Sequence, residues 1–89
     1  MKYVMFEKRM SDGCSHMVPV IFPNTLVHDE VANALTLGPL KGYIPCSAGE
    51  ISPLDMQPHG ESTTLGLKAD EERDETVIRL NDYGGAFIG

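Results

Sequence analysis

Residues 3–22, YVMFEKRMSDGCSHMVPVIF, contain two apolar runs separated by a polar segment. The first run, Tyr3 to Phe6, suits a strand that is covered on both faces, because its side chains do not alternate in polarity. The segment between the runs includes Ser11-Asp12-Gly13, where glycine can adopt the positive φ of a tight turn. Pro19 cannot donate a hydrogen bond to a neighbouring strand, so the second strand should lie at a sheet edge or start near Pro19. The pattern predicts a β-hairpin.

An amphipathic helix is predicted next, at about residues 28–37. Asp29 and Glu30 fall in its first turn, where carboxylates favour the positive end of the helix dipole. Gly38 followed by Pro39 is a typical helix end. The apolar residues that would form its buried face are Val27, Val31, Ala34 and Leu35.

The sequence pattern in the middle of the chain predicts shorter strands. Residues 42–51 suit a strand interrupted by Pro45, and Gly49 within it indicates a bulge or a close backbone approach. Residues 54–61 suit an edge or broken strand because Pro58 lies within them. Residues 62–67 suit a further short strand or a loop.

A second helix is predicted over residues 70–81. Asp70 is a plausible N-cap, and Glu75 precedes Arg79 by four positions in the favourable order. Positions 70–75 hold five acidic residues, including Asp74. We interpret them as a solvated helix face, with a docking site for a basic partner as the alternative. Val77 and Ile78 supply a narrow apolar stripe.

The order strand, strand, helix, strand, strand, helix predicts an α+β fold. We expect a small antiparallel sheet or partly open barrel of four or five strands with two helices, and an Sm-like or SH3-like barrel as the alternative. Residues 1–82 would form a single domain and residues 83–89 a glycine-rich tail. The predicted core consists of Val4, Phe6, Val20, Phe22, Val31, Leu35, Ile44, Leu65, Val77 and Ile78.

Composition limits the classes of function. The chain has 89 residues, 42% of them hydrophobic, and a net charge of −6. These values exclude a collagen and a typical disordered segment, and they do not suit a membrane span. The 7 Lys and Arg residues are scattered, so no nucleic acid is expected, because phosphate binding needs clustered basic residues. The first residues lack the apolar region of a signal peptide, which predicts a cytoplasmic protein with reduced thiols.

Several residue types could in principle carry chemistry. Cys46 or Ser47 could act as a nucleophile with His59 or His28 as base. Cys46 could also bind a metal, and Glu61 could supply a carboxylate. His28 could satisfy the junction before the first helix by hydrogen bonding, or contact a ligand. Their spacing matches no established motif, and Cys14-x-His16 is too short for a zinc knuckle. We therefore assign no catalytic, cofactor or metal site, and keep Cys46, His59, Glu61 and His28 as weak candidates.

A single small core and two cysteines provide few sources of stability. This favours a non-enzymatic interaction or assembly module, expected to form homo-oligomers. Phe87 and Ile88 indicate that the tail is held down, either by returning to the chain's own sheet or by reaching into a neighbouring subunit or another protein partner. The alternative is a small enzyme or metal-binding protein that uses Cys46, His59 and Glu61.

One resemblance extends over roughly residues 3–80 and depends on short segments in a fixed order. These segments are Phe22-Pro23, Leu26-Val27-His28, Pro45 with Ser47-Ala48-Gly49, Gly60-Glu61-Ser62 and Leu65-Gly66-Leu67. The set resembles small uncharacterised proteins encoded by bacteriophages and prophages. Glu50 departs from the pattern, in which an aromatic residue follows Ser-Ala-Gly. The resemblance implies an origin and assigns no functional residues.

Overall fold

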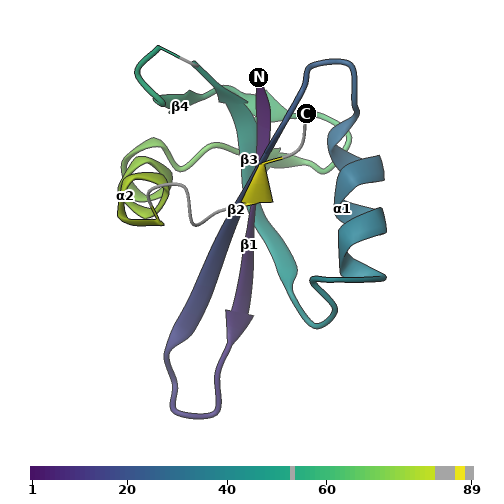
Figure 1. The fold of residues 1–89 in the computed structure, drawn as a ribbon, viewed down its shortest axis with the longest axis vertical. Helices are drawn as coiled ribbons and strands as arrows, with labels where there is room; N and C mark the ends of the chain where they lie inside the picture. Colours follow the sequence, from purple (N-terminus) through teal and green to yellow (C-terminus); the bar gives the residue numbers. More distant parts are fainter. Residues whose placement is uncertain (53, 82–85, 88–89) are drawn as a thin grey trace.

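The computed structural model describes residues 1–52, 54–81 and 86–87, with the backbone alone for residues 81, 86 and 87. It is an α+β fold, as predicted, with strands and helices in the order shown in Figure 1. The elements are β1 (Lys2–Arg9), β2 (Ser15–Phe22), α1 (His28–Thr36), β3 (Ile44–Ile51), β4 (Pro58–His59), β5 (Glu61–Ser62), β6 (Leu67–Lys68), α2 (Glu71–Asn81) and β7 (Ala86–Phe87). No helix among the described residues is both long enough and apolar enough to cross a membrane.

The main sheet has the strand order β4-β3-β1-β2-β7, with β1 at its centre. β1 is antiparallel to both β2 and β3, and β1 and β2 form the predicted hairpin. Gly13 in its turn has the expected positive φ of 88°. The sheet is open, because β4 and β7 form its two edges. The predicted small, partly open sheet with two helices is therefore found among the described residues.

The strands at the two edges are short. Among the described residues, β4 pairs with Glu50 and Ile51 of β3, and β7 pairs in parallel with Val20 and Ile21 of β2. β5 and β6 form a separate two-stranded sheet. Residues 86–87 of the predicted tail return to the chain's own sheet as β7, which is one of the two predicted alternatives. The remainder of the tail, residues 83–85 and 88–89, lies outside the described residues, so a tail contact with a partner stays a prediction.

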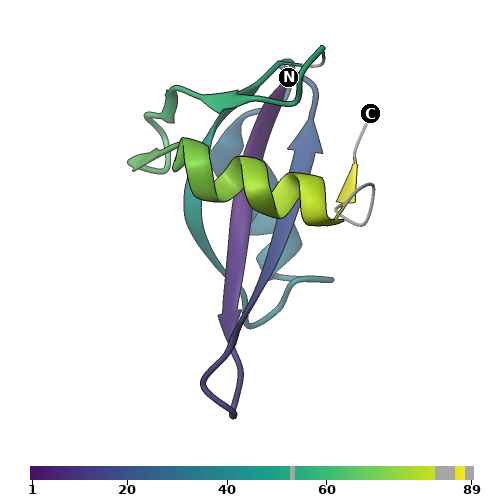
Figure 2. The same ribbon diagram turned by 90° about the vertical axis from the view of Figure 1, so that its left-hand side faces the viewer.

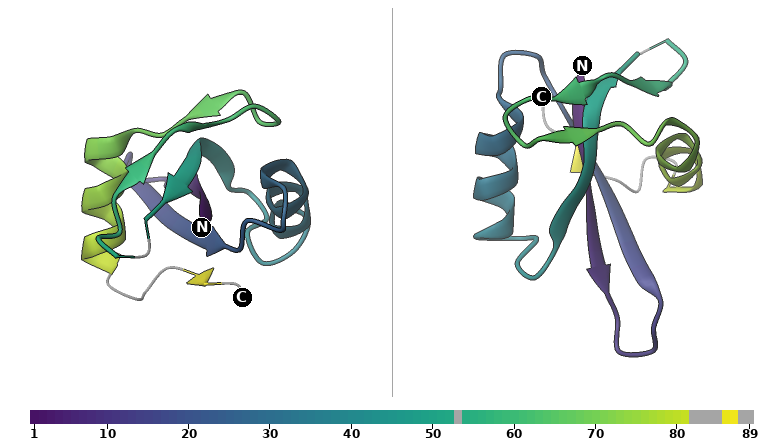
Figure 3. Two further views of the ribbon diagram at one scale, coloured as in Figure 1. Left: turned by 90° about the horizontal axis from the view of Figure 1, so that it is seen from above. Right: turned by 180° about the vertical axis from the view of Figure 1, so that it is seen from behind.

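The two helices pack on opposite faces of the sheet (Figures 1 and 3). Side chains alternate along β1, so the strand contributes to a core on each face. The core on the α1 side contains Val4, Phe6, Val20, Phe22, Val31, Ala32 and Ala48. The core on the α2 side contains Tyr3, Met5, Ile21, Ile51 and Ile78. The continuous apolar run of β1 is thus covered on both faces, as predicted.

Most of the predicted core residues are buried, but Ile44 is not. Its side chain is 69% exposed, whereas Leu35, Leu65 and Val77 are partly buried. Ile44 pairs with Glu7 on the α2 side of the sheet, and α2 crosses that face nearer the other end (Figure 2). Nothing among the described residues covers the apolar side chain there.

Both predicted helices form within a residue or two of the expected positions. The N–H of Arg73 donates to Asp70 Oδ1 at 3.3 Å, which confirms Asp70 as the N-cap of α2. Arg79 Nε lies 2.9 Å from Glu75 Oε1, the expected i,i+4 pair. The interpretation of all five acidic residues as a solvated face is wrong at one position: Asp74 is fully buried. Its carboxylate points into the sheet rather than into solvent.

Gly49 permits a close approach between β3 and its neighbours. A Cβ atom at this position would clash with the backbone carbonyl of His59 and lie 3.2 Å from the Ala69 side chain. The predicted close approach is confirmed at Gly49, while the irregularity in strand pairing lies nearer the start of β3.

We expect Gly49→Ala to lower the free energy of unfolding by about 2 kcal/mol, because backbone must move to admit the methyl group. Gly38→Ala is the matched control. A Cβ there would meet only the carbonyl of Ala34 at an ordinary 3.5 Å, so its effect should stay within about 0.5 kcal/mol. Urea denaturation followed by circular dichroism measures both variants. Equal effects would contradict the close packing of β3 against β4.

Candidate functional site

The most connected polar group in the structure is the carboxylate of Asp74, buried between α2 and the sheet. Asp74 Oδ2 accepts hydrogen bonds from Tyr3 Oη and Ser47 Oγ, each at 2.6 Å. The backbone N–H of Asp70 donates to the same oxygen at 3.2 Å. The donors therefore come from β1, from β3 and from the start of the helix itself.

Arg73 completes this network from the solvent side. Its Nε and Nη2 lie 3.2 and 3.1 Å from Asp74 Oδ1. Nη2 also donates to Ser47 Oγ at 2.8 Å and lies 3.6 Å from Cys46 Sγ. The buried carboxylate is thus paired with a guanidinium whose side chain is 40% exposed. Pairing of this kind offsets the large cost of removing a carboxylate from water.

A β-bulge brings Cys46 and Ser47 to this network. Met5 pairs with Ser47, and Phe6 pairs with Pro45, so Cys46 is an extra residue in β3. In a regular strand, consecutive side chains point to opposite faces, but a bulge interrupts that alternation. Cys46 packs against the α2-side core, and Ser47 bonds to Asp74 on the same side. The bulge therefore directs two successive side chains toward Arg73.

The surroundings of the network alter the ionisation of its members. Burial raises the pKa of Tyr3 well above its usual range, and the hydrogen bond to Asp74 raises it further. Burial also raises the pKa of the Cys46 thiol, although the nearby Arg73 guanidinium opposes the change. Burial works against the charge of Arg73, but the bonds to Asp74 outweigh it and raise the pKa of Arg73. The neutral phenol and thiol are favoured, and the guanidinium stays charged.

The polar groups of this network bond to one another. Ser47 is 1% exposed, so its hydroxyl is not presented to a substrate. Among the described residues, every buried side-chain nitrogen or oxygen has a hydrogen-bond partner. A nucleophile needs access to a substrate and a base that is free to accept its proton. The network instead attaches α2 to β1 and β3.

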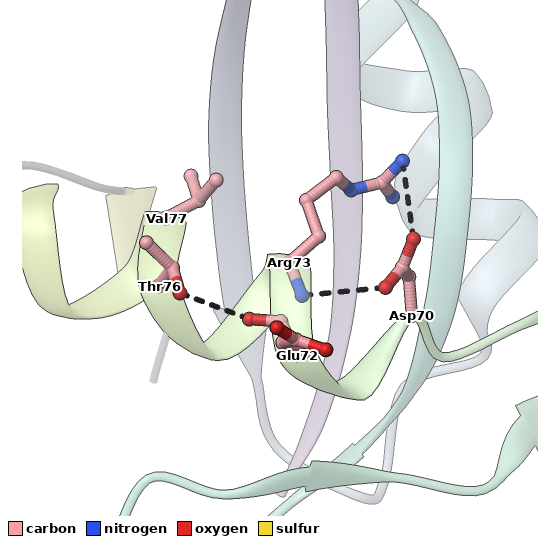
Figure 4. A pocket seen from close by; sticks show the side chains of 5 residues that line it. All are labelled: Asp70, Glu72, Arg73, Thr76 and Val77. Carbon is pink, nitrogen blue, oxygen red and sulfur yellow. Dashed lines mark hydrogen bonds and ion pairs between the residues drawn. The ribbon is translucent and has the colours of Figure 1, made fainter.

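An open depression of about 360 Å³ lies on α2 beside the network (Figure 4). Its lining includes the two carboxylates of Asp70 and Glu72 but only one cationic side chain, Arg73. Arg73 Nη1 lies 3.6 Å from Asp70 Oδ2, and Thr76 Oγ1 donates to the carbonyl of Glu72 at 3.0 Å. The cation is therefore already paired, and the lining offers little to an anionic ligand.

The structure does not gather the predicted candidate residues. His59 pairs with Glu50 in the sheet, and Cys46 lies four residues before Glu50, about 13 Å away along the strand. Glu61 is exposed on β5 opposite Lys68. Within residues 1–52 and 54–81, no group of three or more His, Cys, Asp or Glu side chains could hold a metal ion. Cys14 and Cys46 are both free thiols.

His28 satisfies the junction before α1, as the sequence predicts. It is buried, and its Nε2 lies 2.9 Å from the carbonyl oxygen of Gly49. Its ring meets that of Phe22 edge to face, with centroids 5.5 Å apart. The imidazole therefore joins α1 to β3 inside the core.

Sequence reasoning missed the network of Tyr3, Ser47, Arg73 and Asp74, although one signal for it was present. Asp74 precedes Val77 and Ile78 by three and four positions, which places it on the apolar stripe of α2. An acidic residue on the buried face of a helix requires donors from the element opposite. No protein-family model, curated protein or solved structure matches this chain.

Replacing the buried carboxylate should destabilise the protein. Asp74→Asn removes the negative charge that faces Arg73 and leaves an imperfect set of acceptors for the hydroxyls of Tyr3 and Ser47. We expect a loss of about 2 kcal/mol in the free energy of unfolding. The matched control is Glu72→Gln on the exposed surface of the same helix, with an expected change within about 0.5 kcal/mol. Equal losses in urea denaturation would contradict the role given to Asp74.

The raised pKa of Tyr3 predicts a loss of stability in alkali. Since the folded protein favours the neutral phenol, its contribution is fully present below the unfolded pKa of about 10 and decreases above it. We expect the stability advantage of the native protein over Tyr3→Phe to shrink by about 1.4 kcal/mol per pH unit above that value. Urea denaturation from about pH 8 to about pH 11 measures this difference. A constant difference across that range would show that the folded state does not favour the neutral phenol.

Proposed function

We propose that this chain is a non-enzymatic protein-interaction module that associates with a second copy of itself. The observation that carries the proposal is a region of the main sheet that the other described residues leave uncovered. This region lies between α2 and the tip of the β1–β2 hairpin, in the lower part of Figures 1 and 2.

The edges of the sheet support this proposal first. Since β7 pairs only with Val20 and Ile21, residues 15–18 of β2 have a strand partner on one side only, among the described residues. Since β4 pairs only with Glu50 and Ile51, residues 44–46 of β3 are likewise open at the outer side. Unpaired strand edges favour association with another chain.

The face of the sheet on the α2 side supports it further. Below α2, this face carries Glu7, Arg9, Ser15, Met17 and Ile44, which we call the bare face. Figure 2 shows α2 crossing the sheet above this part of the hairpin. Met17 is half-buried against the α2-side core, while Ile44 is largely exposed. Exposed apolar side chains are typical of interaction surfaces when they gather on one face rather than lie scattered.

The alternative, an enzyme or metal protein that uses Cys46, His59 and Glu61, gains no support from the geometry, because the register separates Cys46 from His59. An origin in a bacteriophage or prophage, and action in the cytoplasm with both thiols reduced, remain part of the proposal. The free thiols and the ordered sequence segments are consistent with that setting.

Sedimentation equilibrium over a wide range of concentrations tests the proposal. The average mass should rise from that of one chain, 9.7 kDa, toward twice that value as concentration increases. A mass of one chain at every concentration up to about 1 mM, which corresponds to a binding free energy weaker than about −4 kcal/mol, would refute self-association.

A further inference from the structure

We propose that two copies of the chain pack their bare faces together around a two-fold axis, with Glu7 of each copy opposite Arg9 of the other. This inference rests on the proposed function and names the surface and the occupant. It is carried by the strand register, by the unpaired charges of this face and by the distribution of charge over the molecule.

The strand register places one row of side chains across the sheet. Ile44 of β3 and Met17 of β2 both pair with Glu7 of β1. Arg9 lies two residues farther along β1 and pairs with Ser15, so it points to the same face as Glu7. The bare face thus has a carboxylate between two apolar side chains, with a guanidinium about 7 Å along the central strand.

Among the described residues, the two charges are not engaged in ion pairs. Neither Glu7 nor Arg9 makes an ion pair or a side-chain hydrogen bond with any residue in the described ranges. Arg9 is exposed and Glu7 is half-buried. By contrast, Arg73 and Arg79 on α2 are each paired with an acidic side chain. The bare face therefore keeps a positive and a negative group available for another molecule.

This pattern is complementary to itself. In a two-fold contact, if residue i of one copy meets residue j of the other, then j of the first meets i of the second. Two β1 strands that face each other in antiparallel orientation would place Glu7 over the other copy's Arg9 twice. The same arrangement brings the apolar ends of each row, Met17 and Ile44, toward the opposite copy.

The distribution of charge favours this end of the molecule over α2 as the place where a second copy would dock. The whole chain carries −6. The hairpin end, residues 7–18 with 38–46, has three basic residues (Lys8, Arg9, Lys41) and two acidic ones (Glu7, Asp12), a balance of 3 − 2 = +1. The excess acid lies elsewhere in the chain, and α2 contributes to it with four acidic residues against two arginines. Since like charges oppose association, contact through the hairpin end is favoured over contact through α2.

The expected affinity is low. A stable dimer buries about 800 Å² on each partner, a substantial part of the total accessible surface of 5396 Å². The bare face is three strands wide and covers less than that. We therefore expect a dissociation constant on the order of 100 μM.

Charge reversal provides a direct test. Glu7→Arg and Arg9→Glu each place like charges together twice in the dimer, so each should raise the dissociation constant by about tenfold or more. The double variant Glu7→Arg/Arg9→Glu recreates both pairs with their signs exchanged and should restore the native value. Sedimentation equilibrium measures association, and circular dichroism confirms that each variant is folded.

A second pair of variants tests the apolar part of the face. Ile44→Lys should weaken association, because it places a charge in the contact. Leu54→Lys is the control, since Leu54 is 96% exposed and lies between β3 and β4, away from the bare face. Its dissociation constant should equal that of the native chain.

The outcomes separate the inference from the proposed function. If the native chain dimerises but the single charge reversals leave the dissociation constant unchanged, or the double variant fails to restore it, this interface is overturned and self-association stands. If the native chain remains a single chain at every concentration, the proposed function fails as well. Restoration by the double variant would identify the interface, because no effect on folding alone predicts it.

Discussion

The position of α2 depends on one buried carboxylate. Asp74 receives hydrogen bonds from β1 and β3 and pairs with Arg73 on its own helix. Apart from Asp74, only Ile78 of α2 is buried among the side chains that the structure describes, so apolar packing alone gives the helix little hold. On the opposite face, α1 is held by Val31 and Ala32 in an apolar core and by the bond from His28 to Gly49. The two helices are therefore attached to one sheet by different kinds of interaction.

Much of this architecture follows from local patterns. The uninterrupted run at Tyr3 to Phe6 predicts a central strand, because each face of that strand needs apolar side chains when helices cover both. The helix ends at Asp70 and near Gly38 follow from capping chemistry that acts within a few residues. Pro58 correctly indicates a strand at the sheet edge, since proline cannot complete a ladder on both sides. The expectation from Pro19 is wrong, because β2 begins at Ser15 and β7 pairs with its outer side at Val20 and Ile21.

The parts that sequence reasoning missed depend on contacts between distant segments. Asp74 lies among acidic neighbours that are solvated, and its burial requires Tyr3 and Ser47, which are far away in the chain. Ile44 is β-branched and apolar, so its sequence environment predicts a buried position in a strand. It is exposed because α2 does not extend over it. The bulge at Cys46 is a property of pairing between β1 and β3, and one strand's sequence does not specify its partner's register. Strand register also separates the candidates Cys46 and His59, because His59 pairs with Glu50, four residues beyond Cys46.

The bulge also leaves residue 46 of β3 without a pairing partner in β1. Because Pro45 and Ser47 pair with consecutive residues of β1, the ladder would remain continuous if residue 46 were absent. Substitution at this site is thus constrained by the guanidinium and the helix above it rather than by the demands of the strand. Substitutions at residue 46 would therefore place different side chains beside Arg73 without changing the order or register of the sheet.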